Sequence, residues 1–86
     1  MIKSPFCGRQ EEVAAHIAEM LYGETSKNTV KLLTDFLRIQ RGISERTGRS
    51  NVFTWRGIGI DVTPRKAACW IEDPAVLRSW QECCRR

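Results

Sequence analysis

The stretch FTWRGIGIDVTPRKAACWI (Phe53–Ile71) decides how this chain of 86 residues is interpreted. It contains two of the three tryptophans, the basic pair Arg65-Lys66 and the strongest helix-start signal, Thr63 followed by Pro64. A capping threonine before a proline is typical of a helix N-terminus, because the missing N–H of proline costs nothing at the first helical position. The stretch therefore predicts a helix over residues 63–71.

The residues just before this helix, 52–62, allow two interpretations. Val, Phe, Thr, Trp and Ile are strand formers, whereas Gly57 and Gly59 each weaken a helix by about 1 kcal/mol relative to alanine. These residues favour a short strand, or a hairpin that turns at Arg56-Gly57. The alternative is that they form the first helix of a helix-turn-helix motif.

Apolar spacing and capping signals predict three further helices. Residues 9–22 and 26–41 each carry one apolar stripe at helical spacing, and Asp73-Pro74 starts a last helix that runs through Cys83. Residues 43–50 form either an extra helical turn or a basic loop. The predicted fold is a single domain, residues 1–86, that is mainly α, with about four short helices and one extended segment near residues 52–60.

Basic side chains concentrate in the second half of the chain. Between residues 38 and 66 there are seven basic side chains, Arg38, Arg41, Arg46, Arg49, Arg56, Arg65 and Lys66, against two acidic ones, Glu45 and Asp61. Six of the seven are arginines, whose planar guanidinium suits phosphates and base edges. Such an excess indicates a surface for a polyanion or an acidic protein. The alternative is a solvated surface without a partner.

The segment from Asp61 to Ile71 resembles the recognition helices of small prophage and plasmid regulators, which often read Gly-Val-Ser-Pro-Arg with Trp-Ile near the end. The resemblance implies a helix-turn-helix protein. Since a recognition helix enters the major groove N-terminus first, Thr63, Arg65 and Lys66 would meet phosphates or base edges. The alternative is a capped amphipathic helix that Trp70 packs and that has no DNA role.

We therefore predict a small regulatory protein that binds duplex DNA, and a homodimer would increase its affinity and site length. Its predicted nucleic-acid-binding residues are Arg38, Arg41, Arg46, Arg49, Arg56, Thr63, Arg65 and Lys66. A phage-type inhibitor that binds an acidic host protein or nucleoprotein complex is the alternative function. That function predicts an exposed aromatic anchor, because interface hot spots favour Trp and Arg. Its partner-binding residues would be Phe53, Trp55, Arg49 and Arg56.

Other classes of function find little support in the residues. There is one histidine, His16, and none of the four cysteines lies in a Cys-x-x-Cys pair, so we expect no metal, no cofactor and no enzyme activity. No apolar segment is as long as a membrane span, and the first residues lack the apolar core of a signal peptide. We expect a cytoplasmic protein with reduced thiols.

Overall fold

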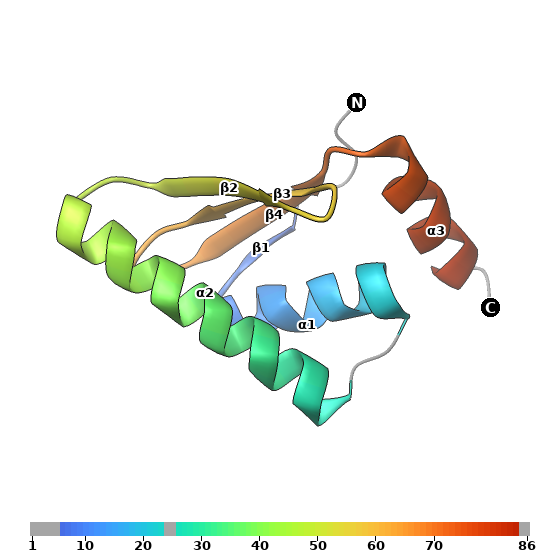
Figure 1. Ribbon diagram of the computed structural model, residues 1–86, viewed down its shortest axis with the longest axis horizontal. Coiled ribbons are helices and arrows are strands. Elements are labelled where there is room, and N and C mark those ends of the chain that lie inside the picture. The colour runs from blue at the N-terminus through green and yellow to red at the C-terminus, as the bar shows by residue number, and fades with distance from the viewer. Residues whose placement is uncertain (1–5, 24–25, 85–86) are drawn as a thin grey trace.

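The computed structural model describes residues 6–23 and 26–84, with the side chains of all of these except residues 79, 80 and 82–84. Within this part of the chain, seven elements follow one another (Figure 1): β1 (Phe6–Gly8), α1 (Gln10–Tyr22), α2 (Lys27–Thr47), β2 (Asn51–Trp55), β3 (Ile58–Val62), β4 (Ala67–Ile71) and α3 (Pro74–Cys84). The strands form one antiparallel sheet in the order β1-β4-β3-β2. The fold is α+β, so the prediction of a mainly α domain with four helices is wrong.

A turn and a strand replace the predicted helix over residues 63–71. The Thr63 backbone N–H and hydroxyl both donate to the Lys66 carbonyl, at 2.9 and 2.8 Å, and close a tight turn. In β4, Ala67, Cys69 and Ile71 point to one face and are at most 2% exposed. Thr63 thus stabilises a turn between strands. Residues 67–71 are extended because β3 pairs with all five of them and β1 pairs with residues 67–69.

The predicted hairpin turn at Arg56-Gly57 is confirmed. Arg56 and Gly57 have φ values of 48° and 85°, and Trp55 pairs with Ile58 across the turn. Two positive φ values in a two-residue loop match the right-handed twist of the strands that it joins. The extended segment predicted near residues 52–60 therefore contains most of β2 and the first half of β3.

The other three predicted helices are present. α1 begins and ends within one residue of the predicted range, and Asp73 caps α3 by accepting the Ala75 N–H at 2.8 Å. α2 is capped by the Ser26 hydroxyl, and it continues beyond the predicted end at residue 41 to Thr47. It ends at Gly48, whose φ of 68° is the left-handed conformation that glycine adopts easily.

The core lies between one face of the sheet and the two helices α1 and α2, which pack against each other and against the strands (Figure 1). It contains 13 buried apolar side chains among the described residues, including Val13 and Ile17 of α1, Leu37 of α2 and Ile58 and Ile60 of β3. The opposite sheet face is not covered by α1 or α2. No helix in the described part of the chain is long and apolar enough to cross a membrane.

On the uncovered sheet face, the Trp70 ring of β4 lies directly over Gly59 of β3. A Cβ atom at position 59 would overlap Cε2 and Nε1 of this indole, whose N–H donates to the Glu72 carboxylate. We expect Gly59→Ala to lower the free energy of unfolding by about 1–3 kcal/mol, because the ring must move. Urea unfolding followed by circular dichroism measures this cost.

A double-mutant cycle tests whether Trp70 causes the cost of Gly59→Ala. In a Trp70→Ala background the overlap is gone, so Gly59→Ala should cost much less there. An equal cost in both backgrounds would contradict this explanation and would indicate a backbone effect of glycine.

His16 of α1 makes stability sensitive to pH, because its ring stacks on Phe6 with centroids 4.4 Å apart and is partly buried. Burial lowers the pKa of His16 below 6.5, although the charge of Glu19 opposes this. The unfolded chain therefore binds a proton first as the pH falls, and stability decreases from about pH 7 downward through 6.5. Urea midpoints should fall between about pH 7 and about pH 5.5 in the wild type and stay flatter in His16→Asn. Parallel pH profiles would rule out His16 as the cause.

Candidate functional site

The residues predicted to read DNA lie in a turn and not at the start of a recognition helix. Thr63, Arg65 and Lys66 belong to the β3–β4 turn, and β4 follows directly. Arg65 and Lys66 are exposed, so their charges face solvent. Because residues 58–62 and 67–71 are strands, the helix-turn-helix geometry is absent from this segment.

The turn nevertheless lies beside a second basic loop, which joins α2 to β2. A shallow depression of about 310 Å³ between them is lined from both sides, by Ser44, Glu45, Gly48, Arg49, Ser50, Thr63 and Pro64. A neighbouring depression of about 510 Å³ also has Arg49 in its wall. We define the basic end as the four exposed cations of these two loops and of the last turn of α2: Arg46, Arg49, Arg65 and Lys66.

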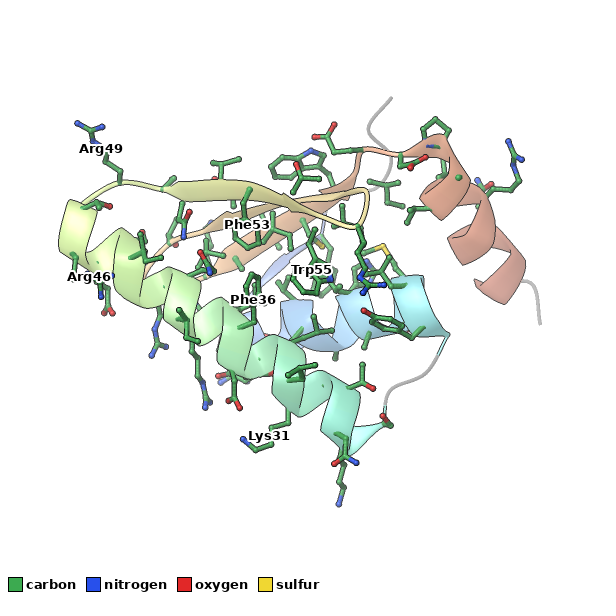
Figure 2. The ribbon with its side chains drawn as sticks, viewed as in Figure 1. Lys31, Phe36, Arg46, Arg49, Phe53 and Trp55 are labelled. Carbon is green, nitrogen blue, oxygen red and sulfur yellow. The ribbon has the colours of Figure 1, made fainter. Side chains whose placement is uncertain are left out.

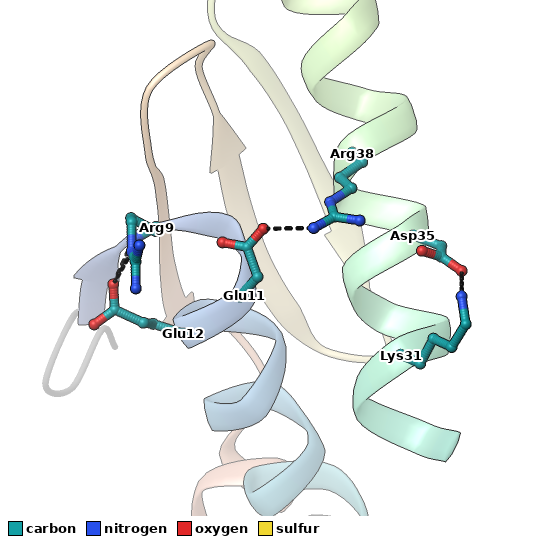
Figure 3. Close-up of polar contacts among 6 residues, drawn as sticks. All are labelled: Arg9, Glu11, Glu12, Lys31, Asp35 and Arg38. Carbon is teal, nitrogen blue, oxygen red and sulfur yellow. Dashed lines mark hydrogen bonds and ion pairs between the residues drawn. The ribbon is translucent and has the colours of Figure 1, made fainter. Parts of the chain in front are cut away.

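Within the described part of the chain, the cations of the basic end form no ion pair with an acidic side chain. The ion pairs among the described residues are Arg9–Glu12, Lys31–Asp35 and Arg38–Glu11 (Figure 3), and none includes a member of the basic end. Figure 2 shows Arg49 projecting away from the sheet at the end of α2. The four charges are therefore available to an external anion.

The other three predicted nucleic-acid-binding arginines lie elsewhere. Arg38 donates to Glu11 of α1 at 3.0 Å, and Arg41 is partly buried, with its Nε atom shielded and unpaired. Arg56 lies in the β2–β3 turn, with its guanidinium carbon 6.0 Å from the centre of the Trp55 ring. It is at the far end of β2 from Arg49. The structure thus brings Arg49 and Thr63 together at one depression, with Arg65 and Lys66 in the same turn as Thr63 and Arg46 on the last turn of α2.

Phe53 and Trp55, the predicted aromatic anchors, point from β2 toward α2 (Figure 2). Phe36 of α2 lies against both, with ring centroids 5.5 Å from Phe53 and 4.9 Å from Trp55. All three rings are partly buried. They form an aromatic cluster at the side of the molecule where the sheet ends, and neither Phe53 nor Trp55 stands free in solvent.

Two large apolar side chains extend this cluster outward, and sequence reasoning did not single them out. Leu32 and Ile39 of α2 are 70% and 63% exposed. Being seven residues apart, they lie on the same side of the helix, in line with Phe36 and Ile43. The sequence did contain a signal for them: both are apolar residues that lie outside the buried stripe of the helix.

The strand beside this stripe is an edge of the sheet. β2 pairs with β3 only, and its Val52 side chain is 61% exposed. We define the edge face as the α2 stripe together with the β2 side chains that face it: Leu32, Phe36, Ile39, Ile43, Phe53 and Trp55. Val52 alternates with Phe53, so its side chain points to the opposite face of the sheet. An exposed apolar stripe beside an unpaired strand is typical of a protein-binding surface.

The described part of the chain offers no cluster of His, Cys, Asp and Glu side chains that fits a metal ion. Cys7 and Cys69 are free thiols; Cys7 is exposed and Cys69 is buried. Burial raises the pKa of the Cys69 thiol to about 11, which keeps it neutral and unreactive. Cys83 and Cys84 are outside the described side chains.

Lowered pKa values belong to carboxylates in local contacts on the surface. The pKa of Glu11 is lowered by its backbone N–H and by Arg38, and the pKa of Asp35 by Lys31. Such exposed pairs add little to stability, typically below about 1 kcal/mol. These local contacts explain the lowered pKa values of Glu11 and Asp35.

Comparison of the chain with protein-family models, with curated proteins and with solved structures finds no match.

Proposed function

We propose that this protein is a small interaction module that binds an acidic protein partner through the edge face. The observation that carries the proposal is the exposure of Leu32 and Ile39 beside the unpaired strand β2. Complete burial of a leucine or isoleucine side chain is worth about 1.5–3 kcal/mol. A partner that covers these two side chains gains a large part of that energy.

The backbone of β2 supports a partner that adds a strand. In an antiparallel hairpin with a two-residue turn, the residues that flank the turn exchange both hydrogen bonds. Trp55 and Ile58 flank the turn, so we expect the backbone N–H and C=O groups of Asn51, Phe53 and Trp55 to hydrogen-bond to β3. The same groups of Val52 and Thr54 then point outward, away from β3. An extended segment can pair with these groups, while its side chains contact the α2 stripe.

Charge supports an acidic partner over a neutral one. Arg49 precedes β2 and Arg56 follows it, roughly 20 Å apart by strand geometry, and neither forms an ion pair within the described residues. Carboxylates at both ends of an added strand would meet these arginines. Such complementarity raises the association rate and selects the partner. It also disfavours a second copy in antiparallel pairing on β2, because Arg49 would then lie near Arg56 of the other copy.

The phage-type inhibitor predicted from the sequence is one form of this function. A module that occupies an acidic groove of a host protein or nucleoprotein complex blocks that groove for other ligands. The exposed free thiol of Cys7 supports a reducing compartment such as the cytoplasm. DNA reading by a helix-turn-helix is not part of the proposal, because residues 63–71 form a turn and a strand.

Selection from a library of displayed random peptides tests the edge face. We expect enriched peptides to alternate apolar residues and to carry Asp or Glu near both ends. Leu32→Ser/Ile39→Ser should weaken binding of a selected peptide at least about tenfold, because the apolar contacts are lost. The free energy of unfolding should change by less than about 1 kcal/mol, since both side chains are exposed. Titration by fluorescence anisotropy measures the affinity.

Tyr22→Ser is the matched control, since Tyr22 is a large apolar side chain on α1 that is 42% exposed and lies outside the edge face. It should leave the affinity unchanged. Thr54→Pro tests strand addition: it should lower the affinity for the peptide, because proline removes an N–H that we expect to point away from β3. Enrichment of peptides without acidic residues, or equal loss in Tyr22→Ser, would refute the proposal.

A further inference from the structure

We propose that the basic end binds the phosphate backbone of duplex nucleic acid, at a site distinct from the edge face. The two loops that form it are separated by more than ten residues in sequence and meet around one depression. Arg49 and Glu45 are the charged residues in its wall, Arg65 and Lys66 follow Pro64 of the wall in the same turn, and Arg46 lies on the last turn of α2. The local charge is therefore about +3, which suits adjacent phosphates.

The loops that carry these cations are held by hydrogen bonds to the helices. The Ser44 hydroxyl donates to the Arg49 carbonyl at 2.6 Å, and the Gly48 N–H donates to the Ser44 carbonyl at 2.9 Å. The Gln10 side chain of α1 donates to the Thr63 carbonyl at 3.0 Å. Because the backbone is already fixed, binding a phosphate orders only side chains, and the entropic cost of binding is reduced.

The lining of the two depressions favours a duplex over a single strand. Ser50 and Thr63 bring hydroxyl groups next to Arg49, and hydroxyls and arginines are common phosphate ligands. No aromatic side chain lines either depression. Unpaired bases gain their affinity by stacking on aromatic rings, which this surface does not offer.

The same surface fits an acidic protein less well. The exposed large apolar side chains among the described residues are Tyr22, Leu32, Ile39 and Val52, and none belongs to the loops of the basic end. Protein interfaces need an apolar centre, whereas phosphate binding needs charge and hydrogen-bond donors. We therefore assign the edge face to a protein and the basic end to nucleic acid.

Fluorescence anisotropy with a labelled 20-base-pair duplex of random sequence tests this site at low salt. We expect a dissociation constant in the range of about 10⁻⁶ to 10⁻⁴ M, typical of contacts to phosphates alone. The logarithm of the affinity should fall with the logarithm of salt concentration at a slope of about 2–4, as two to four phosphate contacts require. A single strand of the same length should bind more weakly. The same titration with an RNA duplex shows whether the site prefers DNA or RNA.

Paired variants separate the site from overall charge. Arg49→Ser/Arg65→Ser should weaken duplex binding at least about tenfold and should lower the salt slope. Lys27→Ser/Arg78→Ser removes the same charge from exposed positions on α2 and α3, away from the basic end, and should change the affinity less than about threefold. Circular dichroism and thermal unfolding verify that both variants are folded.

Three results would overturn the proposal: no duplex binding at low salt, equal losses in the two double variants, or tighter binding of single strands or polyglutamate. Leu32→Ser/Ile39→Ser provides an independent readout, because it should lose the selected peptide and keep the duplex. A failure of peptide binding with retained duplex binding refutes the proposed function alone, and the reverse result refutes the inference about the basic end alone.

Discussion

The pairing of β4 with strands on both sides is the constraint on which the rest of the structure depends. β1 precedes α1 and α2 in the sequence and β3 follows them, yet β4 lies between β1 and β3 and joins these strands in one sheet. Its inward side chains, Ala67, Cys69 and Ile71, are completely or almost completely buried. Since β1 leads into α1 after a single residue, the position of β1 against β4 also fixes where α1 starts to cross the sheet. The pairing of Cys7 with Ala68 therefore connects the start of the helical layer to the middle of the sheet.

This arrangement leaves β2 at the side of the sheet without an outer neighbour, and α2 is too long to be fully covered there. A helix of 21 residues is about 30 Å long, whereas a strand of five residues is about 17 Å. The buried positions Leu33, Thr34, Leu37 and Ser44 anchor one side of α2. The side next to β2 keeps apolar residues in contact with solvent. The edge face is thus a direct result of a long helix beside a short edge strand.

The edge face and the basic end adjoin each other at Arg49, which precedes β2 and lines both depressions. Ligands at the two surfaces would be neighbours, one an extended acidic segment and the other a phosphate backbone. A partner that contains both protein and nucleic acid would engage the two surfaces together and gain effective concentration from the linkage. The two functions predicted from the sequence, DNA binding and binding to a nucleoprotein complex, therefore do not exclude each other in this fold.

Local signals in the sequence determined the helices α1 and α3, the start of α2 and the turn at Arg56-Gly57. The excess of arginines is also evident from the sequence itself. Caps, apolar spacing and glycine act within a few residues, so one sequence suffices to interpret them. The conformation of residues 67–71 was decided by the tertiary structure. An apolar run of this length fits a helix or a strand, and the choice depends on β1 and β3, which are distant in sequence. The tertiary structure also decided the two surfaces. The packing of α2 leaves Leu32 and Ile39 exposed, and strand pairing brings the loops of Arg49 and Arg65 to one end of the sheet.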